Sequence, residues 1–234
     1  MPKISKEKWK TWGNVFDTFT FRTLFKLAGQ GHFDVIESPV SIGKESNVFT
    51  ARTRQGARII VKIYRLETCD FNRMYDYLKF DPRFKLKKQR RKIIFSWVQR
   101  EFRNLMKARQ AGVLVPKPIA FLNNVLLIEF VGNDEIALKL KDHLPKNKTQ
   151  FLKKIIQNMK KLHKAGLVHA DLSQFNILNY HENPVFIDMS QATTFENPQA
   201  KEFLERDIKN ITNFFNKIGL KTDKSKIKKQ IISN

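Results

Sequence analysis

Residues 167–178, LVHADLSQFNIL, constrain the fold and function of this chain more strongly than any other segment. Asp171 interrupts an apolar, strand-like stretch, and Asn176 follows five residues later. A loop with this spacing can direct the Asp171 carboxylate at a hydroxyl group and then turn back to place the Asn176 amide on a metal ion. His169 is expected to be a hydrogen-bonded structural group, because Asp171 already supplies a base. The segment therefore predicts a catalytic loop.

A second carboxylate follows at Asp188, at the end of the apolar segment VFIDM. A carboxylate at the end of a buried strand is costly unless it is paired or binds a metal. Mg²⁺ is a hard ion that takes oxygen ligands, which Asp and Asn supply. Each of these residues alone is most often a turn or capping residue, but their order predicts Asp171 as catalytic and Asn176 and Asp188 as metal ligands. Asp188 is also a candidate catalytic residue, because aspartates accept the phosphoryl group in some ATPases.

Lys62 lies within the strand-like segment IIVKIY, where its ammonium group needs a charged partner. Glu101, early in the helical segment VQREFRNL, is the expected partner. Considered alone, Lys62 is more often a sheet-edge lysine in solvent, and Glu101 a solvated helix residue. Phosphoryl transfer from ATP needs a lysine on the phosphates, so the order of these residues along the chain favours the functional interpretation.

The segment SIGKESNVF (41–49) lies between strand-like stretches, where a glycine-rich phosphate loop would be expected. It contains only Gly43, so it does not match the G-x-G-x-x-G pattern of ordinary protein kinases. Ser41, Lys44 and Ser46 are the candidate cofactor contacts in this segment. The alternative is a surface turn with Lys44 in water, and the segment by itself favours that alternative.

Strand patterns dominate the first half of the chain and helical patterns dominate the second half. Hairpins are expected at Gln55–Gly56 and at Asn123–Asn124, and a helix capped by Ser96 is expected between them. Residues 66–95 are charged and predict an irregular, flexible basic loop. The expected fold class is therefore α+β, with a mainly antiparallel sheet lobe followed by a helical lobe and a cleft between them.

These patterns divide the chain into an N-terminal helical extension (1–36), a sheet lobe (37–131) and a helical lobe (132–234). Helices are expected from 134 to 165, and the last of them ends at Gly166. Four apolar residues share one face of that helix: Phe151, Ile155, Met159 and Leu162. The basic tail KTDKSKIKKQ is predicted to be frayed.

The charge of the chain is its strongest bulk property. There are 44 Lys+Arg against 22 Asp+Glu, a formal net charge of +22. Such a surface attracts polyanions, because each neutralised phosphate releases counterions. A nucleic acid or a ribonucleoprotein is therefore the expected partner, and an adaptation to solubility or to an unusual cytoplasm is the alternative. The run RFKLKKQRRK (83–92) is a candidate RNA contact or, equally, a solvated insert.

Other compositional features describe the setting of the protein. No run of 18 apolar residues is present, so neither a membrane span nor a membrane partner is expected. Cys69 is the only cysteine, which excludes an internal disulfide. A reducing, cytoplasmic setting is the simplest interpretation.

Seven segments together resemble the RIO atypical protein kinases: SIGKESNVF, IVKIYR, EFRNL, LIEFVG, LVHADLSQFNIL, FIDMSQ and RDIKNITNFF. The likeness runs from about Phe16 to Gly219. Its most diagnostic parts are GKES in place of the glycine-rich loop and IDMSQ in place of Asp-Phe-Gly. The Ser-Gln after Asp188, the LVHADLS segment and the lack of a winged helix domain resemble the first RIO subfamily. Ile42 and Ser46 depart from that subfamily's S-T-G-K-E-A.

The resemblance implies a two-lobed, protein-kinase-like fold whose C-terminal lobe lacks the usual substrate-binding helices. It also implies ATP with Mg²⁺ as the cofactor, with Mn²⁺ as an alternative metal. Backbone groups of Glu129 and Val131 would bind adenine at the crossover between the lobes. The remaining roles it implies are those given above for Lys62, Glu101, Asp171, Asn176 and Asp188.

The resemblance further implies a serine/threonine protein kinase that acts in maturation of the small ribosomal subunit. Precursor ribosomal RNA would then be the target of the positive charge, with serine autophosphorylation and ATP hydrolysis as activities. No Ala-Pro-Glu follows Asp188, so the peptide-docking surface of ordinary kinases is not expected, and ATP hydrolysis as a conformational switch becomes attractive.

Two alternatives stay open. Small-molecule phosphotransferases of the aminoglycoside and choline type share the H-x-D-x-x-x-x-N pattern, although the basic chain and GKES argue against them. A ribosome-assembly scaffold that holds nucleotide only as a structural ligand is the second alternative.

Overall fold

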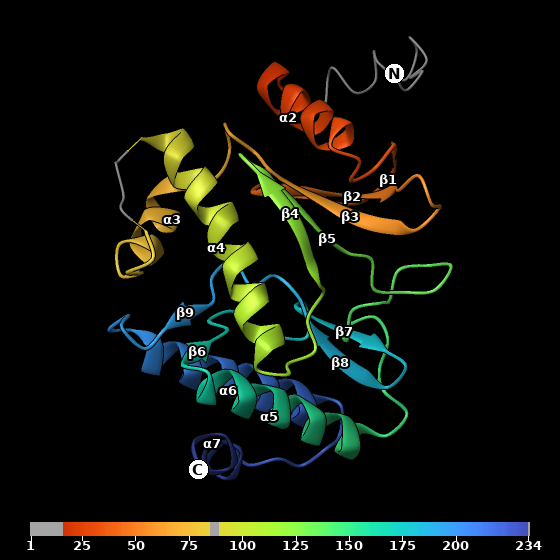
Figure 1. The fold of residues 1–234 in the computed structure, drawn as a ribbon. Coiled ribbons are helices and arrows are strands. Elements are labelled where there is room, and N and C mark those ends of the chain that lie inside the picture. The colour runs from red at the N-terminus through yellow and green to blue at the C-terminus, as the bar shows by residue number, and fades with distance from the viewer. Residues whose placement is uncertain (1–15, 85–88, 234) are drawn as a thin grey trace.

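The N-terminal lobe is built on a five-stranded antiparallel sheet in the computed structural model, which describes residues 16–84 and 89–233. Its strands are β1 (Val35–Ile42), β2 (Ser46–Arg52), β3 (Arg58–Tyr64), β4 (Pro118–Leu122) and β5 (Val125–Glu129). They lie in the order β1-β2-β3-β5-β4 (Figure 1). Gly56 and Asn123, at φ of 83° and 52°, close the two predicted hairpins, because these residue types tolerate positive φ.

The two faces of this sheet bury different partners, because side chains alternate along each strand. On one face, Val61 and its alternate neighbours in β3 pack with helix α2 (Thr18–Gly29), which covers the top of the lobe in Figure 1. On the other face, Lys62 is directed toward the long helix α4 (Arg90–Gln110). The strand pleat thus places one lysine on the inner face of the sheet.

The segment 66–95 contains helix α3 (Phe71–Leu78), so the prediction of an irregular loop there was wrong over these residues. The helix has an apolar face, on which Met74, Tyr77 and Leu78 are all buried. The charged residues of the segment made this face difficult to recognise from the sequence. Asp70 caps the helix by accepting a hydrogen bond from the N–H of Arg73. Residues 71–78 of this segment are therefore folded structure rather than a loop.

Helix α4 also begins earlier than predicted. It starts at Arg90, and Ser96 lies inside it rather than at its N-cap. Ile93 and Ile94 are fully buried and extend the apolar face of the helix into the basic run. Residues 85–88 of that run lie outside the described residues.

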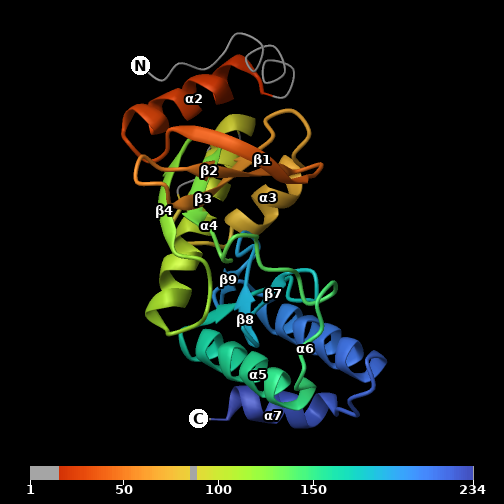
Figure 2. The same cartoon turned by 90° about the vertical axis from the view of Figure 1, so that its right-hand side faces the viewer.

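The C-terminal lobe is mainly helical and lies below the sheet lobe in Figure 2. Its helices are α5 (Lys148–Lys164), α6 (Ala200–Lys217) and α7 (Lys224–Ile232). Short strands pair beside them, β6 (Leu167–Val168) with β9 (Thr193–Thr194) and β7 (Ile177–Tyr180) with β8 (Asn183–Phe186). The predicted α+β class, with a sheet lobe followed by a helical lobe, is confirmed.

Two predictions for this lobe were wrong. The helix expected from residue 134 begins only at Lys148, where Asn147 caps α5. The tail that was expected to fray forms α7, in which Ile227 and Ile231 are 4% and 1% exposed. A pair of isoleucines four residues apart gives a short basic helix one apolar stripe, which packs against α5 and α6.

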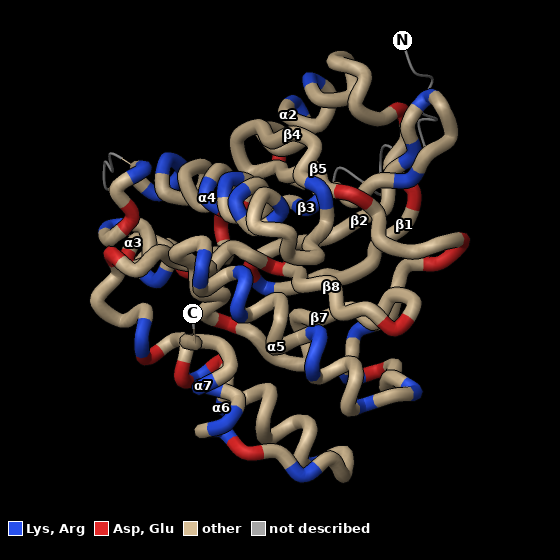
Figure 3. The backbone as a smooth tube through the Cα atoms, turned by 60° about the horizontal axis from the view of Figure 1, so that its bottom comes forward, with Lys and Arg blue, Asp and Glu red and all other residues tan. Residues whose placement is uncertain are grey.

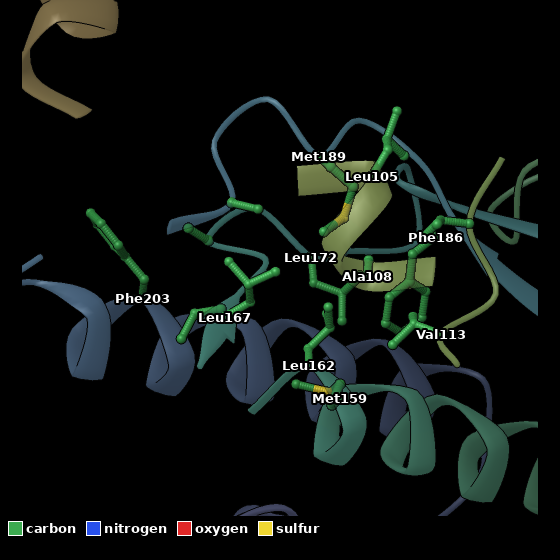
Figure 4. Close-up of a cluster of buried hydrophobic side chains, with 14 of the residues drawn as sticks. Leu105, Ala108, Val113, Met159, Leu162, Leu167, Leu172, Phe186, Met189 and Phe203 are labelled. Carbon is green, nitrogen blue, oxygen red and sulfur yellow. The ribbon is translucent and has the colours of Figure 1, made fainter. Parts of the chain in front are cut away.

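A continuous apolar core links the two lobes (Figure 4). Leu105 and Ala108 of α4 lie in it with Met189 and Leu172, which flank the predicted catalytic residues, and with Leu162 of α5. Each is no more than 2% exposed, and full burial of a Leu or Met side chain contributes about 1.5–3 kcal/mol. The catalytic segments are therefore packed directly on α4.

The described helices differ from membrane-spanning helices in length and composition. None of them combines the length and apolar character that a membrane crossing requires.

Candidate active site

Lys62 makes the contact that joins the two lobes at the candidate active site. Its Nζ lies 2.9 Å from Oε1 of Glu101 on α4 and 3.0 Å from Oδ1 of Asp188, just after β8. The Lys62 and Glu101 side chains are 9% and 1% exposed, whereas that of Asp188 is 41% exposed. The expected Lys62–Glu101 pair is therefore present, and a carboxylate from the second lobe completes it.

Burial and mutual attraction set the charges of this triad. Burial opposes the ammonium of Lys62, but Asp188 and Glu101 outweigh it and hold the pKa of Lys62 well above its usual range. Burial raises the pKa of Glu101. Burial also opposes the Asp188 carboxylate, but Lys62 and the Ser190 hydroxyl, 2.7 Å from Oδ1, lower the pKa of Asp188 to about 2. Asp188 is thus ionised at neutral pH.

The catalytic loop brings Asp171 and Asn176 into direct contact. Nδ2 of Asn176 donates to the Asp171 backbone oxygen at 2.9 Å and to Oδ2 of Asp171 at 3.1 Å. Burial and the negative charge of Asp188 raise the pKa of Asp171, while Arg206 and Arg73 act in the opposite direction. A carboxylate with a raised pKa is better suited to accept a proton near neutral pH.

Asp207 of α6 holds the backbone of this loop, although no role was predicted for it. Its carboxylate accepts hydrogen bonds from the N–H groups of Ala170 at 2.9 Å and Leu172 at 2.8 Å. Ala170 has a φ of 64°, a conformation that a non-glycine residue keeps only where its surroundings hold it. The sequence indicated this role only by placing Asp207 on the apolar face of a helix, next to Ile208.

Asn104 of α4 holds the segment after Asp188 in a similar way, and it too was missed. Its Nδ2 donates to the backbone oxygens of Met189 at 3.0 Å and Ala192 at 2.7 Å, and the side chain is fully buried. It follows Glu101 by three residues, so both project from one face of α4. The sequence indicated this role only through the spacing of Asn104, which places a polar residue on the same helix face as the predicted Glu101.

His169 has the structural role that was predicted for it. Its Nε2 lies 3.1 Å from the backbone oxygen of Ile187, and the residue is 2% exposed. Burial lowers the pKa of His169 to about 4, so the ring is neutral under ordinary conditions. The neutral ring links the catalytic loop to the strand end that precedes Asp188.

Asp188 and Asn176 fit the requirements of a magnesium site. Asp188 is ionised, and its Oδ2 has no hydrogen bond with the described residues. The amide nitrogen of Asn176 is bound to Asp171, which leaves the amide oxygen as the ligand atom. In the described ranges, no three His, Cys, Asp or Glu side chains form a ligand cluster. Mg²⁺ is commonly held by one or two carboxylates plus substrate phosphates and water, so these residues suit a metal that is bound together with nucleotide.

The predicted phosphate contacts lie on the hairpin between β1 and β2. Ser41 and Lys44 are exposed and Ser46 is half-buried, and Ser46 pairs with Tyr64 of β3. The N–H of Gly43 donates to the backbone oxygen of Ser46 at 3.0 Å, which closes the turn. Contact of these side chains with phosphate stays a prediction.

The predicted adenine contacts lie at the crossover between the lobes. The backbone oxygen of Val131 accepts a hydrogen bond from the N–H of Ala137 at 2.8 Å. The N–H of Val131 makes no backbone hydrogen bond in the part of the chain that the structure describes. Next to it, a Cβ at Gly132 would lie 2.1 Å from a backbone oxygen, so the turn requires glycine. This geometry leaves the N–H of Val131 available as a hydrogen-bond donor. The roles of Glu129 and Val131 in binding adenine stay predictions.

Comparison with known proteins decides the family. The family model described as the RIO domain matches residues 47–228, which is most of the chain. This protein belongs to the RIO family of atypical serine/threonine-protein kinases. The RIO-type serine/threonine-protein kinase Rio1 of Haloferax volcanii is 42% identical over 219 residues, covering 93% of this chain and 76% of that protein. The Rio1 of Methanocaldococcus jannaschii is 45% identical over 212 residues, covering 89% and 72%.

More distant relatives support the same assignment. Human serine/threonine-protein kinase RIO1 is 34% identical over 209 residues, covering 86% of this chain and 37% of that longer protein. The predicted likeness to the first RIO subfamily agrees with these Rio1 relatives. The Rio2 kinase–ADP/Mg²⁺–phosphoaspartate complex from Chaetomium thermophilum has the same fold, with a TM-score of 0.71, 22% identity and coverage of 92% of this chain and 67% of that one.

The buried neutral His169 predicts a specific acid sensitivity. In the unfolded chain the imidazole binds a proton near pH 6.5, whereas in the folded protein it does so only near pH 4. The unfolded state therefore binds more protons between these values, so the free energy of unfolding falls as pH decreases from about 6.5 to about 4. The loss from this group amounts to up to about 3 kcal/mol.

Urea unfolding at pH 7, 5 and 4 measures this effect. His169→Gln, which has no titrating group, is expected to lose less stability on acidification than the unmodified protein, and His143→Gln, at an exposed histidine, is the matched control. Parallel pH curves for the unmodified protein and His169→Gln would contradict the assignment.

Proposed function

We propose that this protein transfers the terminal phosphoryl group of ATP to a serine or threonine hydroxyl, with Asp171 accepting the hydroxyl proton. Lys62 binds the phosphates, and Asn176 and Asp188 hold the metal. The observation that carries the proposal is the convergence of an N-terminal-lobe lysine on Asp188, next to a loop that pairs Asp171 with Asn176. These are the groups that phosphoryl transfer requires.

Each side chain contributes one physical task. Lys62 stays positively charged and is held by Glu101, so it lies ready for a phosphate without a further conformational search. Asp171 has a raised pKa and receives the proton as the hydroxyl attacks. Bound Mg²⁺–ATP supplies the phosphoryl group and the charge neutralisation of its phosphates. Asp188 and Asn176 offer the metal two oxygen ligands from the same lobe.

A second candidate function is ATP hydrolysis through Asp188 itself. The Asp188 carboxylate is ionised and 41% exposed, so it is a nucleophile that a phosphate can reach. One of its oxygens would form a bond to the terminal phosphorus while the bond to the departing ADP oxygen breaks, and water would then cleave the acyl phosphate. The Rio2 kinase of Chaetomium thermophilum has been crystallised as an ADP/Mg²⁺–phosphoaspartate complex. Hydrolysis by this route would serve as a conformational switch rather than as phosphorylation of a partner.

The excess of basic residues supports precursor RNA of the small ribosomal subunit as the partner. Lys and Arg lie along α4 and over both lobes in Figure 3. Within the run 83–92, Arg83 is bound to Asp81 and Arg90 to the backbone oxygen of Leu66, so both are used inside the protein. Arg91 and Lys92 are exposed at the start of α4 and are the residues of this run proposed to contact RNA.

Turnover of labelled ATP in the presence of Mg²⁺ tests the proposed chemistry. Asp171→Asn keeps the shape of the side chain but removes the base, so transfer to the protein's own serines is expected to fall by about 100-fold or more, with ADP affinity retained. Asp34→Asn, at a distant surface aspartate, is the matched control. Asp171→Asn with full transfer activity would contradict the proposal.

The same assay separates the candidate functions. Phosphoserine detected by mass spectrometry supports the kinase function, and a hydroxylamine-sensitive label that Asp188→Asn abolishes supports hydrolysis through Asp188. Transfer to choline or an aminoglycoside, with no labelled protein, would favour a small-molecule phosphotransferase. ADP binding without any turnover would favour a scaffold.

RNA binding should be dominated by electrostatics. Affinity for a small-subunit RNA fragment is expected to fall by at least about tenfold between 50 and 200 mM salt, because bound phosphates release counterions. Lys92→Gln should reduce the slope of log affinity against log salt, by about one for a single phosphate contact. Lys224→Gln is the control, because Lys224 is already paired with Glu205 at 2.8 Å. An affinity that does not change with salt would contradict RNA as the partner.

A further inference from the structure

Helix α3 is anchored at the meeting point of both lobes. The ring of Tyr77 stacks on Phe203 of α6 with centroids 5.4 Å apart and meets Trp97 of α4 edge-on at 5.8 Å. Met74 and Leu78 are also buried. Aromatic pairs of this kind contribute about 0.5–1.5 kcal/mol beyond their burial, so the position of α3 is fixed by packing.

From this position α3 binds Gln191, which lies three residues after Asp188. Nη2 of Arg73 and the hydroxyl of Tyr77 both donate to Oε1 of Gln191, each at 3.0 Å. Arginine has only donors, so the atom that faces it must be the amide oxygen. Two donors on one oxygen therefore fix the orientation of the Gln191 amide and turn its nitrogen in the other direction.

The amide nitrogen of Gln191 is directed at Asp171. Nε2 donates to Oδ2 of Asp171 at 3.3 Å, and Nδ2 of Asn176 donates to the same oxygen at 3.1 Å. Among the hydrogen bonds of the described residues, none reaches Oδ1 of Asp171. One carboxylate oxygen is thus held by two amides, and the other is available to a substrate hydroxyl.

Several charges surround this carboxylate. Burial and the charge of Asp188, in the segment that leads to Gln191, raise the pKa of Asp171. Arg206 of α6 and Arg73 of α3 lower it. Arg73 is 51% exposed and also lies 3.9 Å from Glu45 in the hairpin that carries the predicted phosphate contacts. The α3 helix therefore contributes both a hydrogen-bonded support and a positive charge to the acceptor side of the site.

We propose that Gln191 is a positioning residue for phosphoryl transfer: held by Arg73 and Tyr77, it orients Asp171 so that the free carboxylate oxygen faces the acceptor hydroxyl. The inference rests on the proposed kinase function, since it assigns a supporting role to Asp171 as base. Gln191 lies in the segment where an ordinary kinase continues into its activation loop. Here a helix inserted between β3 and α4 provides that support instead.

Gln191→Met tests the proposal, because methionine keeps the length of the side chain and cannot donate. Transfer is expected to slow by about tenfold or more, since a small misplacement of a catalytic group is enough to do this. The affinity for Mg²⁺–ADP should be unchanged, because Lys62 and Asp188 keep their contacts. The acid limb of the kcat–pH profile should move to higher pH, because the Asp171 carboxylate loses a donor that favours its charged form.

Matched variants separate positioning from folding. Gln191→Glu keeps the acceptor for Arg73 and Tyr77 but places a second carboxylate beside Asp171, so the acid limb should move further in the same direction. Tyr77→Phe keeps the stacked ring and removes one of the two donors, so a smaller loss is expected. Gln157→Met on the exposed surface of α5 is the control for the substitution itself.

The outcomes distinguish this inference from the proposed function. If Asp171→Asn is inactive while Gln191→Met retains the rate and pH profile of the unmodified protein, the positioning role is overturned and the kinase proposal stands. If Asp171→Asn itself retains full activity, the proposed function fails, and this inference fails with it. A loss of Mg²⁺–ADP affinity in Gln191→Met equal to its loss in kcat would also overturn the positioning role.

Discussion

The position of one buried ammonium group determines how the two lobes meet. Lys62 lies between Glu101, on the helix of its own lobe, and Asp188, from the second lobe, at 2.9 and 3.0 Å. Removing such a charge from water costs several kcal/mol, and only close carboxylate partners offset that cost. The sheet must therefore keep its register, α4 must lie against its inner face, and the segment after β8 must reach upward to the lysine. Both lobes are constrained by the same contact.

The C-terminal lobe supports its side of this contact through backbone hydrogen bonds. Buried Asp207 fixes the catalytic loop at Ala170 and Leu172, and buried Asn104 fixes the segment after Asp188. These contacts hold positive φ values at Ala170 and Asp188, 64° and 58°, that would otherwise be unfavourable. The side chains that perform the chemistry are thus placed by polar residues that do not take part in it.

The sequence was sufficient to predict the fold class and the central residues of the site for a physical reason. Lys62 and Asp188 are charged residues in or at the end of apolar strands, and such charges are costly unless they are partnered. Helix α3 was missed because it lies within a longer segment that was interpreted as charged and irregular, and α7 was missed because its three isoleucines lie among lysines. The roles of Asp207 and Gln191 depend on contacts across 35 and 20 residues of sequence, which spacing along the chain does not reveal.

A double-mutant cycle between Lys62 and Asp188 tests the central claim most directly. The free energy of unfolding is measured for the unmodified protein, Lys62→Met, Asp188→Asn and the double variant. A direct ion pair between the lobes predicts that the two losses are not additive, with a coupling energy of about 1 kcal/mol or more. Additivity within about 0.5 kcal/mol would show that the two side chains do not interact, and would contradict the account.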